Sequence, residues 1–279
     1  MQKSSTENAI EQRSFTEEQW RFYEEQGYVR LGRLVVGAQL EALQQRIDDI
    51  MLGRARLDYG RTQMQVDSED GAYRNIGAAT AGHKGAHLNY RKIEQLEFDP
   101  LFLRYLQRPV FRDACARVYG PGTAIRVMRA MFMNKPAGRG TWLPWHQDIW
   151  TVFDRPPLLT AWTALDPATK ANGCVQVIPG SHKRGHINPA HESGFLTGEL
   201  SEQHCRPEEV VHVEMEAGEI ALFHNFLLHA SDVNRSEAAR RAFSVCYMDA
   251  ATKGDPGRRY TLVFGSGALT PERLESTAV

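Results

Sequence analysis

The sequence Pro144-Trp145-His146-Gln147-Asp148 opens the half of the chain in which we expect both the β-structure and a metal site. Its histidine and aspartate are two residues apart, so on an extended strand both side chains point to the same face and can share one metal ion. On a helix the two side chains would diverge. The motif therefore predicts a strand that carries two metal ligands.

A third ligand is expected further along the chain. Two histidines and one carboxylate form a facial triad, which leaves the opposite face of an octahedral Fe(II) open for other ligands. The candidates are His224, which ends an apolar run that we interpret as a strand, and His229, which follows it. The basic pair Arg240-Arg241 lies beyond them, where one guanidinium could hold the far carboxylate of a dicarboxylate in a bidentate contact.

Short β-rich runs, separated by Gly, Pro and Asn, occupy the chain from residue 124 onward. We expect strands at 126–133, 160–165, 175–178, 210–215, 219–223 and 242–248. Such a succession is typical of a β-sandwich or small barrel. Lys135, which precedes a proline in this region, is interpreted as a solvated turn lysine.

Helices are expected in the first part of the chain. Thr16-Glu17-Glu18-Gln19 is a capping box, and Gly27 is placed to end the helix that it begins. Apolar residues recur at helical spacing over 38–51, and Asp99-Pro100 is a typical N-cap with a proline in the first turn. We interpret the polar, glycine-rich segment 53–94 as a long loop or lid. Helices followed by many short strands favour a single, mainly β, α+β domain.

Charge and composition argue against several classes of function. The 279 residues include 33 basic and 34 acidic side chains, and the basic ones form no stripe of the kind that binds nucleic acid. No apolar run approaches the roughly 20 residues of a membrane helix, and the polar N-terminus lacks a signal core, so we expect a cytoplasmic protein with no membrane partner. Four cysteines without a Cys-x-x-Cys pair indicate neither a zinc knuckle nor a disulfide framework.

Further motifs accompany the ligand pair. They are Phe22-Tyr23-Glu24-Glu25-Gln26-Gly27-Tyr28, Ala161-Trp162-Thr163-Ala164-Leu165, Ile178-Pro179-Gly180-Ser181-His182, His229-Ala230-Ser231, and Asn234 with Arg240. Together with the ligand pair they closely resemble the phytanoyl-CoA dioxygenase family of Fe(II)/2-oxoglutarate-dependent oxygenases. The resemblance extends over about residues 15–249, which is most of the chain.

This resemblance implies a fold, a set of cofactors and a role for individual residues. The fold would be a double-stranded β-helix, a jelly-roll or cupin-like core buttressed by N-terminal helices, with Fe(II), 2-oxoglutarate and O2 as cofactors. The implied residues are the metal ligands His146, Asp148 and His229, the carboxylate-binding Arg240 and Ser231, and Trp162 beside the same cosubstrate. Arg240 is preferred to Arg241 because it matches the family's register. We expect a flexible tail over 1–13, one oxygenase domain over 14–265 and a C-terminal tail over 266–279.

The implied activity is oxidation of an unactivated C–H bond, in most such enzymes hydroxylation, with release of succinate and CO2. The substrate would be a small organic molecule such as a secondary metabolite. Desaturation, epimerisation or ring formation at the same iron centre are alternatives, as are a non-catalytic jelly-roll protein that binds or senses a ligand and a zinc-dependent hydrolase or isomerase. Halogenation is disfavoured, because halide would need the position that Asp148 occupies.

Overall fold

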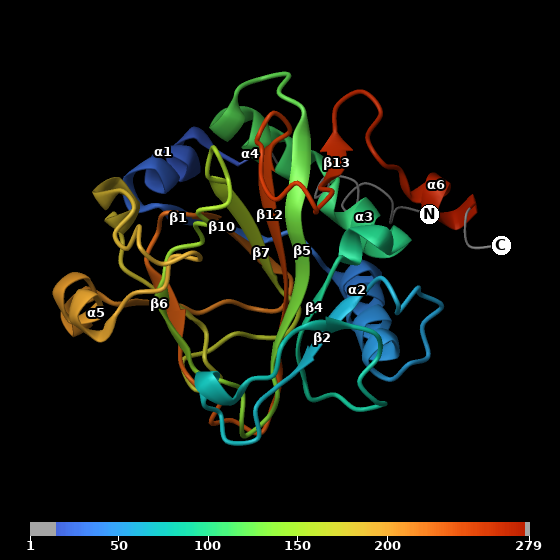
Figure 1. Ribbon diagram of the computed structural model, residues 1–279, viewed down its shortest axis with the longest axis horizontal. Coiled ribbons are helices and arrows are strands. Elements are labelled where there is room, and N and C mark those ends of the chain that lie inside the picture. Colours follow the sequence, from blue (N-terminus) through green and yellow to red (C-terminus); the bar gives the residue numbers. More distant parts are fainter. Residues whose placement is uncertain (1–14, 277–279) are drawn as a thin grey trace, which may run out of the picture.

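Two antiparallel β-sheets form the centre of the protein, whose structure, a computed structural model, describes residues 15–276 (Figure 1). Side chains from both sheets line one cavity between them. This arrangement is the double-stranded β-helix predicted from the sequence, and it places the cavity inside the core instead of on a flat surface.

The larger sheet has nine strands within residues 15–276, in the order β1-β10-β7-β12-β5-β4-β2-β3, with β13 paired to β5. Its strands are β1 (Tyr28–Arg33), β2 (Gln63–Val66), β3 (Thr80–Ala81), β4 (Tyr90–Glu94), β5 (Ile125–Lys135), β7 (Leu159–Ala164), β10 (Glu219–His224), β12 (Arg240–Asp249) and β13 (Thr261–Phe264). The long strands β5 and β12 pair over nearly their whole length and form the middle of this sheet. All strand pairs in it are antiparallel.

The smaller sheet contains the strand pair that carries the two predicted histidine ligands. Its strands are β6 (Leu143–His146), β8 (Val175–Val177), β9 (Val211–Val213) and β11 (His229–Ser231), in the order β6-β11-β8-β9. The strands are short, so the segments that follow them reach the cavity after a few residues.

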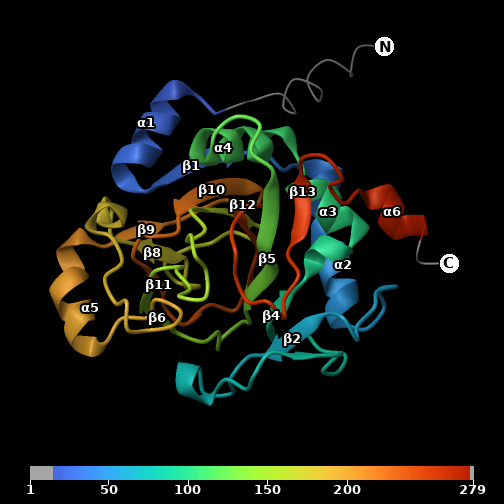
Figure 2. The ribbon, with the colours of Figure 1, turned by 45° about the horizontal axis from the view of Figure 1, so that its top comes forward.

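Most helices lie along the outer face of the larger sheet and beside its edge, whereas α5 lies beside the smaller sheet (Figure 2). They are α1 (Glu17–Gln26), α2 (Gly37–Met51), α3 (Pro100–Leu106), α4 (Pro109–Tyr119), α5 (Gly198–His204) and α6 (Pro271–Ser276), with 3-10 turns η1 (Tyr73–Asn75), η2 (Leu96–Phe98), η3 (Ser181–Arg184) and η4 (Pro207–Glu209). The apolar faces of α2, α3 and α4 share one buried cluster with the larger sheet. This packing leaves the opposite face of the sheet to the cavity. No helix within residues 15–276 is both long and apolar enough to cross a membrane.

The predicted helix starts and ends are confirmed. Thr16 caps α1 through a complete capping box with Gln19, and Gly27 ends the helix in the left-handed conformation, with φ of 80°. Asp99 accepts hydrogen bonds from two backbone amides of the first turn of α3. These local interactions explain why short-range sequence signals were sufficient for the helices.

The segment 53–94 differs from its interpretation as a loop or lid. It contains β2, β3 and β4, and β4 pairs with the central strand β5, so this segment extends the larger sheet. Its polar and charged side chains concealed the strand pattern, because several of them face a cavity instead of an apolar core. The predicted tail 1–13 lies outside the described residues, as do 277–279, whereas 271–276 form helix α6, which has ion pairs to α3.

Candidate metal centre

The two predicted histidine ligands face each other across the smaller sheet. His146 ends β6 and His229 begins β11, and the antiparallel register pairs the two residues directly. Their ring centres are 4.0 Å apart. Asp148 comes two residues after His146, just past the end of the strand, and its carboxylate closes the third side of the cluster.

The three side chains present their ligand atoms to one point. Asp148 Oδ1 lies 4.0 Å from His146 Nε2, and Asp148 Oδ2 lies 3.9 Å from His229 Nε2. One ligand atom from each residue lies within 4.8 Å of the other two. Two imidazole nitrogens and one carboxylate oxygen at this separation form a donor set that suits a divalent transition metal such as Fe(II). Binding of the metal by these residues remains a prediction.

Backbone carbonyl groups orient both imidazole rings. Nδ1 of His146 donates to the Pro144 carbonyl at 2.8 Å, and Nδ1 of His229 donates to the Leu227 carbonyl at 3.0 Å. Because a carbonyl oxygen can only accept, each Nδ1 carries the proton and each Nε2 keeps its lone pair. Both lone pairs therefore belong to the atoms that face Asp148.

Protonation also favours metal binding. Burial, followed by the adjacent His229 ring, lowers the pKa of His146 to about 3. Burial by itself would raise the pKa of Asp148, but the Arg129 guanidinium and the two histidines hold it below its ordinary value. At neutral pH the cluster therefore offers a neutral imidazole and an ionised carboxylate.

Gln147, between the two ligands, anchors them to the surrounding loops. Its fully buried amide donates to the carbonyl groups of Gly185 and Phe226 and accepts from the backbone N–H of Ile187. Its own backbone N–H donates to the carbonyl of Gly194, whose positive φ and close contact leave no space for a side chain. Sequence patterns give Gln147 no role, because its partners lie in loops that are distant along the chain.

Arg240 lies in the same cavity with free hydrogen-bond donors. Its side chain is 2% exposed, and its Nε and Nη1 have no hydrogen-bond partner among the described residues. The guanidinium carbon lies 5.5 Å from the centre of the Trp162 ring. A buried cation without a partner is costly, so this arrangement fits an anionic ligand such as the far carboxylate of 2-oxoglutarate. Ser231, also predicted for this carboxylate, is buried and lines the same cavity.

Arg241 points to the other side of β12. It forms a bidentate ion pair with Asp166, with both N–O distances at 2.8 Å, and a third contact with Asp48 at 2.5 Å. Since neighbouring residues of a strand face opposite sides, these contacts explain why Arg240 and not Arg241 reaches the cavity. Whether Arg240 binds the cosubstrate remains a prediction.

His224, the rival for the third ligand, has other contacts. Its ring packs against Tyr23 and His182, with centre distances of 6.3 Å and 5.1 Å, and its Nδ1 accepts from the Phe226 backbone N–H. It borders the cavity but is not part of the ligand cluster found among residues 15–276. The position of His229 opposite His146 therefore favours His229.

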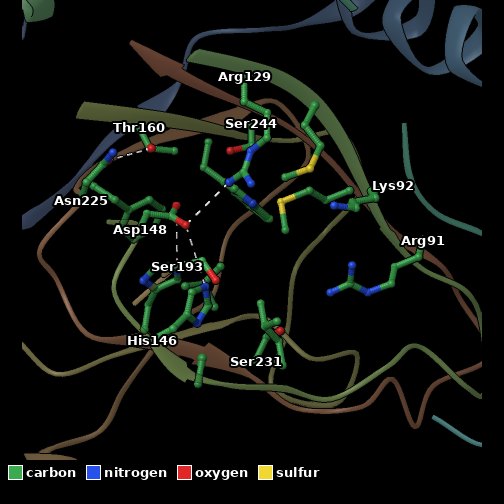
Figure 3. A pocket seen from close by; sticks show the side chains of 18 of the residues that line it. Arg91, Lys92, Arg129, His146, Asp148, Thr160, Ser193, Asn225, Ser231 and Ser244 are labelled. Atoms are coloured by element: carbon green, nitrogen blue, oxygen red, sulfur yellow. Dashed lines mark hydrogen bonds and ion pairs between the residues drawn. The ribbon is translucent and has the colours of Figure 1, made fainter. Parts of the chain in front are cut away.

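The cavity has a volume of about 270 Å³. Figure 3 shows Arg129 pointing toward Asp148 from one wall, with His146 and Ser231 on the other side and Arg91 and Lys92 entering from β4. The apolar part of the lining consists of Met131, Met133, Leu143, Trp150, Trp162, Val175, Phe195, Phe223 and Ala230. A cavity of this kind can hold a small organic molecule beside the metal.

Several lining residues were missed in the sequence or interpreted differently. Phe195 stacks on His146, with ring centres 4.7 Å apart, although it comes from a loop almost fifty residues away in the chain. Lys135 is not a solvated turn lysine: it is 4% exposed and donates to the Thr141 carbonyl inside the cavity wall. Such contacts depend on tertiary structure, and no local sequence pattern predicts them.

Comparison with known proteins provides three further findings at the level of sequence. The sequence model of a family described as Phytanoyl-CoA dioxygenase (PhyH) matches residues 23–242. The chain is 32% identical over 242 residues to a probable phytanoyl-CoA dioxygenase of Caenorhabditis elegans, an alignment that covers 82% of this chain and 74% of that protein. It is 28% identical over 245 residues to the human peroxisomal phytanoyl-CoA dioxygenase, covering 85% and 69% of the two chains.

Solved structures of other proteins also share this fold. One is the non-heme alpha-ketoglutarate-dependent carbocyclase SnoK from nogalamycin biosynthesis, with a TM-score of 0.65, 22% identity and 88% of each chain covered. Another is EctD from S. alaskensis with 2-oxoglutarate and 5-hydroxyectoine, with a TM-score of 0.64, 18% identity, and coverage of 86% of this chain and 78% of that one. At these levels of sequence identity, the similarity to both structures shows a shared fold and nothing further.

Proposed function

We propose that this chain, which belongs to the phytanoyl-CoA dioxygenase family of Fe(II)/2-oxoglutarate-dependent oxygenases, hydroxylates an unactivated C–H bond of a small organic substrate. One observation carries the proposal: a His–Asp–His cluster and a buried arginine with free donors line the same cavity. The cluster can hold one Fe(II), and the arginine can hold the far carboxylate of 2-oxoglutarate.

The ligand residues would determine where the metal sits. Nε2 of His146 and of His229 supply neutral nitrogen ligands, and Asp148 supplies an oxygen ligand and one negative charge. Because all three residues lie on one side, a metal that they held would be open to the cavity. Fe(II), 2-oxoglutarate and O2 together supply the oxidising chemistry, with succinate and CO2 as co-products.

The arginine side of the cavity would orient the cosubstrate. Arg240 would bind the far carboxylate through its free Nε and Nη1, and the Ser231 hydroxyl would donate to the same group. Trp162 lies beside the Arg240 guanidinium and limits its movement. The cosubstrate would then extend from Arg240 toward the ligand cluster, so that its other end reaches the metal.

The apolar lining would keep the substrate in place and exclude water. Methionine and aromatic side chains contribute the larger apolar groups of the lining, and the ring of Phe195 covers one side of His146. Excluding water protects a reactive oxidant from side reactions, while close positioning selects which C–H bond is attacked. The same residues would support desaturation, epimerisation or ring formation, and chemical analysis of the product distinguishes these reactions from hydroxylation.

The test is a substrate-triggered assay of the purified protein with Fe(II) and 2-oxoglutarate. Candidate small molecules are added under 18O2, succinate is measured, and the product is analysed by mass spectrometry. We expect succinate formation that rises with one substrate, and a product that gains one labelled oxygen atom. A product that has two hydrogens fewer than the substrate would indicate desaturation or ring closure instead of hydroxylation. Equal conversion of the substrate with zinc in place of iron would indicate a hydrolase or isomerase. No succinate under any condition would favour a non-catalytic binding protein.

A further inference from the structure

The charged residues of the cavity are mostly basic. They are Arg91, Lys92, Arg129, Lys135, Asp148 and Arg240. In the proposed function the charges of Fe(II) and of the 2-oxoglutarate dianion cancel each other, so the positive excess would remain after both have bound. Positive charge inside an enclosed cavity is unfavourable unless an anion accompanies it.

Three of the basic residues have partners or an assigned role. The Lys92 ammonium lies 2.9 Å from Glu94 Oε1. Lys135 donates to the Thr141 carbonyl, and burial holds its pKa well below the ordinary value. Arg240 would bind 2-oxoglutarate. The excess is therefore located on Arg91 and Arg129.

The carboxylate that forms an ion pair with Arg129 belongs to the metal site. Arg129 Nη2 lies 3.6 Å from Asp148 Oδ1, too far for a strong hydrogen bond, and the guanidinium carbon lies 5.2 Å from the centre of the Trp150 ring. A carboxylate that binds a metal has little charge left for a second cation. The planar guanidinium nevertheless lines the cavity (Figure 3), held beside the Trp150 ring.

Arg91 adds positive charge from the neighbouring strand. Its Nη1 donates to Gln65 Oε1 at 2.9 Å, and its guanidinium carbon lies 5.4 Å from the centre of the Tyr73 ring. These partners are neutral. Figure 3 shows Arg91 on β4 and Arg129 on β5 entering the cavity from adjacent strands.

We propose that Arg129, supported by the charge of Arg91, binds a carboxylate group of the substrate, so that the substrates of this oxygenase are small organic acids. The inference rests on the proposed function, because it assigns Arg240 to 2-oxoglutarate. A planar guanidinium matches a carboxylate in two parallel hydrogen bonds. Since Arg129 is beside Asp148, the carboxylate would fix a nearby carbon of the acid close to the metal.

The experiment measures binding separately from turnover. The protein is loaded with Fe(II) and saturating 2-oxoglutarate without oxygen, so that Arg240 is occupied and no reaction takes place. Benzoate, phenylacetate and isovalerate are then titrated by thermal shift and calorimetry, each against its primary amide and its coenzyme A thioester. We expect the acids to bind about thirtyfold more tightly than the amides, as removal of one charge-assisted contact would predict.

Two variants test the assignment to Arg129. Arg129→Met should remove the preference for acids over amides while iron content and the 2-oxoglutarate requirement stay unchanged, and Arg129→Lys should retain part of it. Arg126→Met is the matched control, because Arg126 lies on the same strand but does not line the cavity. It should keep the full preference.

Several results would overturn the inference. These are equal binding of acids and amides, binding of the thioesters in preference to the free acids, or no binding by any acid. If Arg129→Met raised the 2-oxoglutarate requirement and kept the acid preference, Arg129 would be assigned to the cosubstrate. If Arg129→Met lost iron and showed no other change, Arg129 would be a positioning residue for Asp148. Failure of the proposed function is a separate outcome: the loaded protein would form no succinate in air.

Discussion

Arg240 allows a quantitative test of cosubstrate binding. Its guanidinium is buried and has two donor atoms without partners, so in the loaded enzyme its contact with a carboxylate would be shielded from water. Removing one member of such a contact typically costs about 2 to 5 kcal/mol. At about 1.4 kcal/mol for each factor of ten, Arg240→Leu should raise the 2-oxoglutarate KM by roughly thirtyfold or more.

The same substitution should not destabilise the protein in the absence of cosubstrate. Burial, with a smaller contribution from the nearby Arg91, lowers the pKa of Arg240 to about 10, so its charge is unfavourable where it lies. Replacing an unpaired buried cation with leucine removes that cost. We therefore expect an unchanged or higher Tm without 2-oxoglutarate and a loss of the stabilisation that 2-oxoglutarate provides.

Arg241→Leu is the matched control on the adjacent residue. It leaves Asp166 and Asp48 without their ion-pair partner, so it should lower the free energy of unfolding by about 2 kcal/mol. The 2-oxoglutarate KM of the folded protein should stay close to that of the unmodified protein. The two variants thus separate a binding effect from a stability effect.

The assay is succinate formation against varied 2-oxoglutarate, combined with thermal unfolding with and without it. A normal KM in Arg240→Leu together with a large defect in Arg241→Leu would reverse the assignment of the two arginines. Normal values in both would show that neither residue holds the cosubstrate. Iron content, measured in each variant, should stay unchanged.

Three further predictions concern the candidate metal ligands and Gln147, which lies between two of them. His229→Ala should abolish iron binding in metal analysis while His224→Ala preserves it, and the opposite pattern would identify His224 as the ligand. Asp148→Gly should nearly abolish succinate formation without added carboxylate, since it removes an oxygen ligand; unchanged activity would show that the carboxylate is not required. Gln147→Leu should weaken iron binding about tenfold and lower Tm, because two loop carbonyls lose their donor; an unaltered iron affinity would leave Gln147 with a role in stability alone.

The predictions from sequence were most successful for features that depend on residues close together in the chain. The preference for Arg240 over Arg241 rests on the family resemblance, and strand alternation explains why only one of the two can reach the cavity. The spacing of His146 and Asp148 predicted two clustered ligands, although the expected strand ends at His146 and Asp148 lies just past it. The capping box at Thr16 is likewise local. The predicted family is confirmed, because the motifs that carried the resemblance lie within the matched residues 23–242.

Residues brought to the cavity from a distance could not be predicted in this way. Arg91 and Lys92 lie on a strand whose charged residues resemble a loop sequence, since the strand faces a polar cavity. Phe195 reaches His146 through a loop, and Lys135 is buried by the packing of glycines around it. Each of these positions depends on how separate segments pack, which leaves no periodic signal in a single sequence.

The direct pairing of His146 with His229 has a consequence for insertions and deletions. Deleting Ala230 or Ser231 from β11, with the rest of the strand kept in register, would bring Leu228 opposite His146 and turn His229 to the other face. The connections on either side of the strands carry no such constraint, because their length does not alter the register. A library of variants that changes substrate preference should therefore tolerate added or missing residues in the loops at the cavity entrance, while β6 and β11 should accept substitutions only at constant length.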